Sequence, residues 1–488
     1  MADKISILDM ATFCKKKGFV YPSGEIYGGL AGFWDFGPLG VEFKNNIKKE
    51  WWKFHVQSRE DIVGIDGSII TNPNVWKASG HIDNFSDVYV RCKECKKDNK
   101  LDKNEVGKVK CECGGEYNVV GDLNLMFKTN VGPVDGNVSY LRPETAQLMF
   151  ADFRLVAENA RVKLPFGIAQ IGKAFRNEIS PRDFLFRSRE FEQMEIEYFV
   201  HPDKIKKCPY IKEVLDYEIN VLSAELQKKD KDAVKMTMKK ALEKKIIKTE
   251  WHAYWLATEH KWFVDLGANP NNFRIRQHVA EELSHYALDT WDLDYKFPFG
   301  WKELQGMANR TDFDLQQHIK VSKTDLSLFD NDSNKKVVPH VVAEPSQGVE
   351  RAMLVFLFDA YNDDKKRGNI VLKLHPNLAP VKIGIFPLAT KLKDNGRKVY
   401  DSLKNDFMCQ FDTAGSVGKR YARSDEVGIP FCVTFDFDSL KDKQVTIRSR
   451  DTTKQIRVKI KELKDILRKL LDGEKLESFG KIITSKSL

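Results

Sequence analysis

The sequence predicts two domains, an α+β domain over residues 1–375 and an α/β domain over residues 376–488. In the first domain, residues 170–199 form a strand, a charged loop and a second strand, which is the pattern of a hairpin. In the second domain, segments with strand and helix patterns alternate. The 488 residues suffice for more than one core, and 42% hydrophobic with 11% aromatic residues is typical of globular proteins.

The segments on either side of the hairpin differ in composition. Residues 41–56 have the apolar spacing of an amphipathic helix, and residues 61–73 are predicted to form a strand that ends at Pro73. Residues 201–261 are rich in lysine with helical spacing, so we expect a helical insertion with a solvated face, with a dedicated RNA-binding role as the alternative. After Thr249 the sequence is again typical of a core.

The hairpin carries four arginines and five glutamates within residues 176–197. Side chains alternate between the two faces of a strand. One face of the second strand is apolar and is assigned to the core: Met194, Ile196 and Tyr198. The other face combines a ring with polar and acidic groups: Phe191, Gln193, Glu195 and Glu197.

This combination fits a ligand with a polyphosphate, a flat ring and an ammonium group. Arginine is the best fixed donor for phosphate oxygens, an exposed phenylalanine offers a stacking face, and carboxylates bind amines. ATP together with an amino acid meets all three demands. The sequence has neither Gly-x-x-x-x-Gly-Lys-Ser/Thr nor Gly-x-Gly-x-x-Gly, so arginines and a sheet, rather than a glycine-rich loop, would hold the nucleotide.

The second domain follows a proline-containing linker at residues 376–388 and carries most of the net charge. Residues 380–488 contain 23 Lys and Arg against 15 Asp and Glu, which gives +8 of the chain's +9. A basic domain on a neutral body fits a nucleic-acid partner, and a lysine-rich soluble surface is the alternative. Strands are expected in 381–388, 430–437 and 444–450, and helices in 395–406 and 456–471.

Four of the eight cysteines cluster within residues 90–120, which we expect to be an inserted knuckle: Cys92, Cys95, Cys111 and Cys113. Two close pairs of cysteines are typical of a structural four-thiolate zinc site. The second pair is one residue shorter than usual, so a knuckle with free thiols is the alternative. The other cysteines are scattered, as in reduced cytosolic proteins. With no secretory signal and no run of about 18 apolar residues, we expect a cytoplasmic protein that is not bound to membranes.

Several segments resemble known motifs in the correct order. "FRNE" (175–178) with "RSREF" (187–191) resembles motif 2 of the class II aminoacyl-tRNA synthetases, and "GVER" (348–351) resembles motif 3. The helix and strand before Pro73 resemble motif 1, the dimer element of that family. "YGGLAGFWDFGPLG" (27–40), "RPETAQ" (142–147) and "EPSQG" (344–348) are similar to the glycyl-tRNA synthetases of the dimeric single-chain type. "GSVGKRYARSDEVGIPFCVTFDF" (415–437) resembles their anticodon-binding domain.

The resemblance implies a class II synthetase fold, built on an antiparallel sheet with flanking helices, followed by an α/β anticodon-binding domain. It implies a glycine–tRNA ligase that forms glycyl-adenylate from glycine and ATP with Mg²⁺ and then transfers glycine to tRNA(Gly). A homodimer is expected, and DNA is not an expected partner. Glycine's own carboxylate attacks the α-phosphate, so catalysis would depend on positioning and electrostatics rather than on a protein nucleophile.

The family pattern assigns catalytic roles to Arg176, Glu178 and Arg351. Arg176 would contact the α-phosphate, whereas Arg187 and Arg351 would hold the γ-phosphate. Phe191 would stack on adenine, Glu178 would fix the adenine or amino-acid side of the pocket, and Glu303 would bind Mg²⁺ or the nucleotide. The full set expected to bind ATP is Arg176, Asn177, Glu178, Phe186, Arg187, Phe191, Glu303, Leu304, Gly348 and Arg351.

Three carboxylates are expected to hold the glycine ammonium group: Glu144, Glu195 and Glu344. The full expected glycine site adds Lys100, Phe191, Gln193, Ser346 and Gly348. Lys100 lies in "KLD" (100–102), where the family has an arginine, and it lacks the bidentate fork. Arg142 and Arg310 would either position the substrates or pair with glutamates. Every competing amino acid is larger than glycine and can be excluded by clash, so no editing site is expected.

The residues expected to contact tRNA are Lys419, Arg420, Arg423, Arg448, Arg450 and Arg457. Two other functions remain open. A synthetase-like RNA-binding or polymerase-accessory protein would have lost Arg176, Arg351 or the glutamates, all of which are present. A class II enzyme specific for serine, threonine or histidine would not need so many acidic groups around so small a space.

Overall fold

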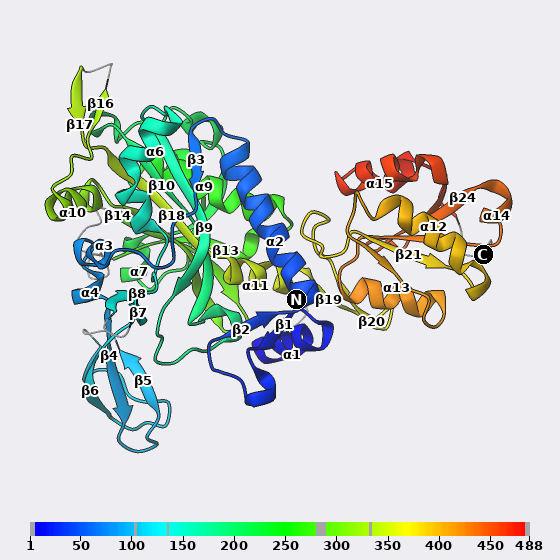
Figure 1. The fold of residues 1–488 in the computed structure, drawn as a ribbon, viewed down its shortest axis with the longest axis horizontal. Helices are drawn as coiled ribbons and strands as arrows, with labels where there is room; N and C mark the ends of the chain where they lie inside the picture. Colours follow the sequence, from blue (N-terminus) through cyan, green and yellow to red (C-terminus); the bar gives the residue numbers. More distant parts are fainter. Residues whose placement is uncertain (1–4, 102–104, 134–135, 280–288, 331–333, 484–488) are drawn as a thin grey trace.

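A computed structural model describes the protein as two bodies (Figure 1), over residues 5–101, 105–133, 136–279, 289–330 and 334–483. The larger body contains a nine-stranded sheet, and the smaller C-terminal body contains a five-stranded sheet. The predicted fold class, an α+β domain on a largely antiparallel sheet followed by an α/β domain, is confirmed. No described helix combines the length and the apolar composition needed to span a membrane.

In spatial order the strands of the large sheet are β12 (Val234–Thr237), β11 (Glu218–Leu222), β13 (Phe273–Gln277), β14 (Asp289–Phe297), β15 (Gly300–Asn309), β18 (His340–Gly348), β10 (Glu190–Val200), β9 (Phe166–Phe175) and β3 (Ile62–Ile65). The sheet is antiparallel through its centre. Strand β11, next to the edge strand β12, pairs in parallel with β13, and the edge strand β3 pairs in parallel with β9.

Helices cover one face of this sheet and bury its apolar side chains. They are α2 (Pro38–Trp52), α9 (Glu250–Asp265) and α11 (Val349–Ala360). The predicted core face of β10 packs here: the Tyr198 ring lies 5.1 Å from that of Trp251 and 5.2 Å from that of Trp255. Three further helices pack at the β9–β10 end of the sheet: α5 (Ala146–Ala151), α6 (Phe153–Ala160) and α10 (Phe313–Ser322).

A buried ion pair ties α2 to the rest of this body. Lys44 Nζ lies 2.6 Å from Glu350 on α11 and 3.4 Å from Glu192 on β10. Glu350 also accepts a hydrogen bond from the Glu192 backbone at 3.0 Å. Because an isolated buried charge is costly, these partners fix where α2 sits over the sheet.

Two predictions near this region differ from the structure. The strand predicted over residues 61–73 ends at Ile65, and Pro73 begins helix α3 (Pro73–Ala78), which the Asn72 side chain caps. Proline suits a first helical position because that position needs no N–H donor. Residues 201–261 contain β11 and β12 as well as the short helices α7 (Ala224–Lys228) and α8 (Met238–Glu243) and most of α9, so the segment is mixed rather than wholly helical. Alternating Ile219 and Val221 are buried against the sheet, whereas most of the lysines are exposed.

Smaller units surround the large sheet. Helix α1 (Ile7–Lys17) precedes the pair β1 (Val20–Pro22) and β2 (Trp34–Phe36), and helix α4 (His81–Asn84) precedes the cysteine-containing sheet. That sheet has the order β5 (Asp98–Leu101), β4 (Ser86–Cys92), β6 (Tyr117–Asn124). Three hairpins complete the body: β7 (Lys128–Val131) with β8 (Asn137–Tyr140), β16 (Leu328–Asp330) with β17 (Lys335–Val337), and β19 (Tyr361–Asp364) with β20 (Asn369–Leu372).

The C-terminal sheet has the order β22 (Cys409–Phe411), β21 (Ile383–Pro387), β23 (Phe431–Phe435), β24 (Gln444–Ser449), β25 (Gln455–Lys459). Its helices are α12 (Lys393–Leu403), α13 (Val417–Glu426), α14 (Ser439–Asp442) and α15 (Leu463–Leu471). The terminal helix predicted over 456–471 is wrong in its first part, since residues 455–459 form β25. Ile456 and Val458 alternate into the core there, and this period-two burial suits a strand.

We predict that Gly40→Ala destabilises the large body. Gly40 lies in the first turn of α2, where an added Cβ would lie 1.8 Å from the Phe19 backbone oxygen. Overpacking against side chains costs about 1–3 kcal/mol, and a backbone obstacle cannot rotate away, so we expect a loss of at least about 2 kcal/mol in the free energy of unfolding. Chemical unfolding followed by far-ultraviolet circular dichroism, which reports on both domains, measures it. Gly418→Ala, whose Cβ would meet nothing within 4 Å, is the matched control, and an equal effect of both substitutions would contradict the packing argument.

Candidate active site

A cavity of about 440 Å³ lies on the face of the large sheet that carries Gln193 and Glu195. Its lining includes every residue predicted to bind ATP or glycine except Asn177. The Asn177 backbone instead donates a hydrogen bond to the Leu125 carbonyl at 2.7 Å, beside the cavity. The structure therefore gathers side chains from Lys100 to Arg351 into one site.

Three neighbouring strands place a row of residues across the cavity floor. Glu195 on β10 pairs with Ser346 on β18, and Ser346 pairs with Gly306 on β15. Gln193 donates a hydrogen bond from Nε2 to the Ser346 hydroxyl at 3.2 Å. A Cβ at Gly306 would meet no other atom within 4 Å, so this position contributes open space rather than a side chain.

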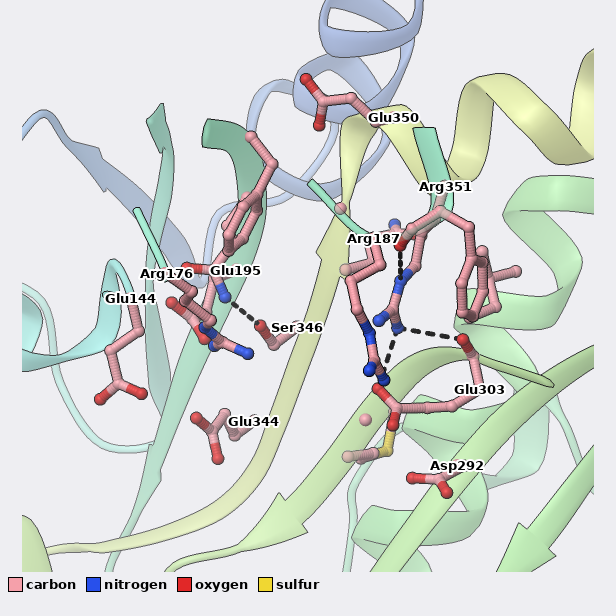
Figure 2. A pocket seen from close by; sticks show the side chains of 18 of the residues that line it. Glu144, Arg176, Arg187, Glu195, Asp292, Glu303, Glu344, Ser346, Glu350 and Arg351 are labelled. Atoms are coloured by element: carbon pink, nitrogen blue, oxygen red, sulfur yellow. Dashed lines mark hydrogen bonds and ion pairs between the residues drawn. The ribbon is translucent and has the colours of Figure 1, made fainter. Parts of the chain in front are cut away.

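Carboxylates crowd one end of the cavity (Figure 2), where Glu144, Glu195 and Glu344 lie on the same side of Ser346. Burial alone would raise the pKa of Glu144, but His81, whose Nε2 lies 3.3 Å away, holds that pKa below its usual value. Burial and the charge of Glu144 raise the pKa of Glu195. This end of the cavity therefore favours a cationic ligand, which would relieve the repulsion.

Arg310 is the cation built into this acidic end. It donates to both oxygens of Glu344, at 2.9 and 3.0 Å, and to both oxygens of Asp314, at 2.7 and 2.8 Å. Even so, burial raises the pKa of Glu344 to about 8. One arginine shared by two carboxylates does not balance the cluster, so the preference for a further positive charge remains.

Glu197 lies two residues beyond Glu195 on the same strand face but below the cavity lining. Its side chain is fully buried, and neither oxygen has a hydrogen-bond partner among the described residues. Burial and the charge of Glu344 raise the pKa of Glu197 well above its usual value. Burial next to Glu344 therefore favours the protonated form of Glu197, because a second buried charge there would be repelled.

Arginines dominate the opposite end, where Figure 2 shows Arg187, Arg351 and Glu303 together. Arg351 donates from Nη1 to the carboxylate of Glu303 at 3.1 Å, and its guanidinium lies 4.6 Å from the centre of the Phe186 ring. Arg187 Nε lies 3.9 Å from Glu178 Oε2, too far for a hydrogen bond. This end can therefore accept an anion with several oxygens.

Arg176 lies next to Glu195 in Figure 2, and its charge also helps to hold the pKa of Glu303, at the other end, below its usual value. Its Nε donates to the Pro143 carbonyl at 3.0 Å, and its guanidinium lies 5.4 Å from the centre of the Phe191 ring. Its two terminal nitrogens have no hydrogen bond to a described residue. Both Arg176 and Phe191 line the cavity, so a ligand that spans the two ends would pass them.

The sequence interpretation misjudged or missed some residues around the cavity. Arg142 lies outside the lining and donates to the carbonyls of Lys173 and Gly67, each at 2.6 Å, so it is structural. His278 and Asp292, 2.9 Å apart, do line the cavity, and no spacing in the sequence indicated them. The pairing of His81 with Glu144 likewise depends on the fold. The four-residue spacing of Arg310 and Asp314 was the one available local signal.

The cysteine-containing sheet reaches the cavity through Lys100 on β5. Lys100 Nζ lies 2.7 Å from Asp87 and 3.7 Å from Glu178. Asp102, the end of the "KLD" segment, lies outside the described residues. Lys100 thus contributes a cation next to the expected adenine side of the site.

The four predicted cysteine ligands lie together at the far end of the same sheet. All four sulfur atoms lie within 4.8 Å of one another, with Cys92 and Cys113 3.5 Å apart and Cys95 and Cys111 3.6 Å apart. A Cβ at Gly115 would lie 2.8 Å from the Cys92 sulfur, so glycine leaves room for the thiols. Tetrahedral thiolate coordination is what Zn²⁺ prefers, and this donor set fits it despite the shortened second pair.

Comparisons with known proteins agree with this arrangement. Residues 133–359 match the family "tRNA synthetase class II core domain (G, H, P, S and T)", and residues 381–470 match "Anticodon binding domain". The chain is 44% identical to glycine–tRNA ligase of Acetivibrio thermocellus, over 95% of this chain and 98% of that protein. It is 43% identical to the Caldanaerobacter subterraneus enzyme, over 96% and 100%. The chain belongs to the glycine–tRNA ligase family. Giardia lamblia prolyl-tRNA synthetase, solved with prolyl-adenylate, shares the fold, with a TM-score of 0.60 and 15% identity over 96% of this chain and 79% of that one.

In this family member, the anticodon-binding domain uses most of the predicted tRNA-binding arginines internally. Arg420, Arg448 and Arg450 are at most 7% exposed. Arg420 donates to the Pro387 carbonyl at 2.7 Å, and Arg448 binds the carboxylate of Asp425 at 2.8 and 2.9 Å. The prediction that these three arginines contact tRNA is corrected, because their donors are directed into the fold.

The remaining predicted residues lie at the surface. Lys419 is exposed. Arg423 binds Asp412 at 2.6 Å and keeps 46% of its side chain exposed. Arg457 binds Asp436 and Asp442 at 2.6 and 2.8 Å. Lys419 and Arg423 therefore stay predicted tRNA contacts, whereas Arg457 is tied to two carboxylates.

Arg448→Ala should lower the stability of the domain, whereas Lys419→Ala should weaken tRNA binding. Removing Arg448 leaves Asp425 buried without its main partner, so we expect a loss of about 3–5 kcal/mol in the stability of the anticodon-binding domain. Lys419→Ala should leave the melting temperature unchanged while weakening tRNA binding and reducing its salt dependence. Calorimetry and filter binding measure the two effects. Weaker tRNA binding by Arg448→Ala at unchanged stability would contradict the structural assignment.

Proposed function

We propose that this chain acts as a glycine–tRNA ligase at the cavity on the large sheet. The observation that carries the proposal is the cavity's division, with carboxylates around a space that lacks side chains at one end and arginines at the other. Glycine brings a positive ammonium group and no side chain, and ATP brings a triphosphate. Both substrates fit the charge of the end assigned to them.

In the first half-reaction, a carboxylate oxygen of glycine attacks the α-phosphorus of ATP. A new bond forms between that oxygen and phosphorus, the bond to the β-phosphate oxygen breaks, and pyrophosphate leaves. In the second, a ribose hydroxyl at the 3′ end of tRNA(Gly) attacks the glycyl carbonyl, and AMP leaves. No protein nucleophile is needed, so the side chains act by orienting reactants and stabilising charge.

We assign the phosphates to the arginines. Arg176 lies where the α-phosphate of a bent ATP would pass, and its terminal nitrogens can stabilise the charge that develops there. Arg187 and Arg351 would hold the γ-phosphate. Phe191 offers its ring to adenine beside Glu178. In this proposal Arg351 exchanges part of its pairing with Glu303 for phosphate oxygens.

Mg²⁺ enters this proposal as the partner of ATP. Glu303 lines the arginine end, and a carboxylate oxygen is the ligand type that Mg²⁺ prefers. The ion would neutralise part of the charge on the leaving pyrophosphate. Asp292 lines the same end but is already paired with His278 and Arg276, at 2.9 and 2.5 Å.

Glycine specificity follows from space rather than from attraction. Glu144, Glu195 and Glu344 would surround the ammonium group, with Ser346 next to the α-carbon. A pocket gains only about 1–3 kcal/mol from one methylene, but it can exclude a larger side chain by clash. Glycine is the smallest amino acid, so exclusion alone suffices.

The partners beyond the small substrates are tRNA(Gly) and a second copy of the chain. The anticodon-binding domain carries most of the chain's net positive charge, and Lys419 and Arg423 are our proposed tRNA contacts.

Strand β3 lies at the edge of the large sheet, and Ile69 and Ile70 just beyond it are 37% and 41% exposed. An unpaired edge favours association. We propose that a homodimer forms through β3 and α2, and that the enzyme works in the cytoplasm, where its eight cysteines, none of which forms a disulfide, stay reduced.

Pyrophosphate exchange with each of the twenty amino acids tests the proposed function. The purified chain should incorporate labelled pyrophosphate into ATP with glycine alone. Stimulation by another amino acid would overturn the specificity. No stimulation by any amino acid would favour an accessory protein without catalytic activity.

Glu195→Gln should raise the glycine requirement far more than the ATP requirement. Losing one charge-assisted contact of about 1.5–3 kcal/mol corresponds to at least a tenfold higher KM for glycine, with the KM for ATP within about twofold. Glu197→Gln is the matched control two residues away. Glu197 is fully buried and does not line the cavity, so the glycine KM should change by less than about threefold. Equal effects of the two substitutions would refute the assignment of Glu195 to glycine.

We also propose that the four cysteines hold a structural Zn²⁺. Elemental analysis of the purified chain should find zinc, and Cys113→Ser should lower its content. Chelation should loosen the sheet of β4, β5 and β6 and so displace Lys100, seen as faster amide exchange in β5. A protein free of zinc but with unchanged exchange would contradict the proposal.

A further inference from the structure

The hairpin of β19 and β20 connects the active site to the anticodon-binding domain. It follows directly after helix α11, which carries Arg351 in its first turn and ends at Ala360, one residue before β19 begins. Figure 1 shows the hairpin between the two bodies, next to α13 of the anticodon-binding domain. A rigid helix and a short hairpin thus extend from the ATP site to the other domain.

Arg367, in the turn of this hairpin, binds several groups across the domain boundary, which the ion pair of Lys17 with Glu426 also crosses. Its Nη1 donates to the Arg450 carbonyl at 2.7 Å and to Asp425 Oδ2 at 3.2 Å, and its Nη2 donates to the Asp451 carbonyl at 2.9 Å. On its own side, Nε lies 3.2 Å from Asp364. Only 18% of the Arg367 side chain is exposed. One planar guanidinium is therefore held by three acceptors of the other domain.

The acceptors of Arg367 are themselves fixed within the anticodon-binding domain. Asp425 is 1% exposed, and Arg448 holds it by two hydrogen bonds. Arg450, whose carbonyl accepts from Arg367, turns its own side chain back and donates to the carbonyl of Leu374, just before the linker, at 2.8 Å. The two arginines therefore cross the boundary in opposite directions.

The residues around this network are closely packed and hydrogen-bonded. A Cβ at Gly428 would lie 3.1 Å from the Leu372 carbonyl at the end of β20. Asn46 on α2 donates to the carbonyls of Leu378 and Ala379 at 3.3 and 2.9 Å, which holds the linker itself. With the linker fixed, rotation of the domain about it is the motion that remains. A planar fork bound at three points opposes that rotation, because its geometry is fixed.

We propose that Arg367 is a positioning residue for the tRNA-dependent step: it sets the orientation of the anticodon-binding domain relative to the active site. The inference rests on the proposed function, since a bound tRNA has to reach both domains at once. A domain that rotates freely would hold the anticodon without delivering the 3′ end to glycyl-adenylate. Small misplacements of reactants cost as much as about 100-fold in rate. Glycine activation involves the large body alone and does not need the contact.

The test compares two activities of the full-length chain. Arg367→Ala should lower kcat/KM for charging of full-length tRNA(Gly) by at least about tenfold, while glycine-dependent pyrophosphate exchange stays within twofold of wild type. Small-angle X-ray scattering should show a broader distribution of distances between the two bodies. Arg367→Lys keeps the charge but not the fork, so it should lower charging in the same direction. It also serves if the alanine variant does not fold.

Lys365→Ala is the control on the same turn. Its side chain is 85% exposed and pairs with the neighbouring Asp363, so both activities should be unchanged. Charging by Arg367→Lys within twofold of wild type, or an equal loss of charging and exchange in the variants, would overturn the positioning role. A wild-type chain without glycine-dependent exchange would instead refute the proposed function, so the two failures are distinguishable.

Discussion

The register of β10 against β18 places Gln193, Glu195 and Glu344 on the cavity face of the sheet. A slip of one residue along β10 would turn Glu195 into the core and Met194 into the cavity, because side chains alternate along a strand. The aromatic packing of Tyr198 against Trp251 and Trp255 on the opposite face makes such a slip costly. The hydrophobic core on one face thus holds the carboxylates on the other face together against their mutual repulsion.

The repulsion among these carboxylates favours the binding of a cationic ligand. Arg310 balances part of the charge of the acidic end, and burial next to Glu344 raises the pKa of Glu197 beneath it. What remains is a preference for a cation next to Ser346 and Gly306. At the other end the arginines are not fully engaged by protein carboxylates. The two substrates would complete both ends at once, which explains why opposite charges lie in a single cavity without neutralising each other.

Local patterns predicted much of this arrangement, and long-range contacts decided the rest. Alternation along β10 was enough to separate Met194, Ile196 and Tyr198 from Glu195, and the order of the motifs located Arg351. Composition could not predict whether Arg420, Arg448 and Arg450 are exposed or buried, because a basic domain can direct its arginines to solvent or to its own carbonyls. Pro73 was equally ambiguous, since proline is suited to the end of a strand and to the start of a helix. The pairing of His81 with Glu144 joins residues that only the fold brings together.

The most direct measurement of the central claim is a crystal structure of the chain with ATP and glycine, or with a stable analogue of glycyl-adenylate. We expect the phosphates to contact Arg176, Arg187 and Arg351, and the amino group to lie among Glu144, Glu195 and Glu344. We also expect no room for a methyl group on the α-carbon next to Ser346. Guanidinium groups turned away from the phosphates, or a cavity that admits a branched side chain at that carbon, would contradict the account.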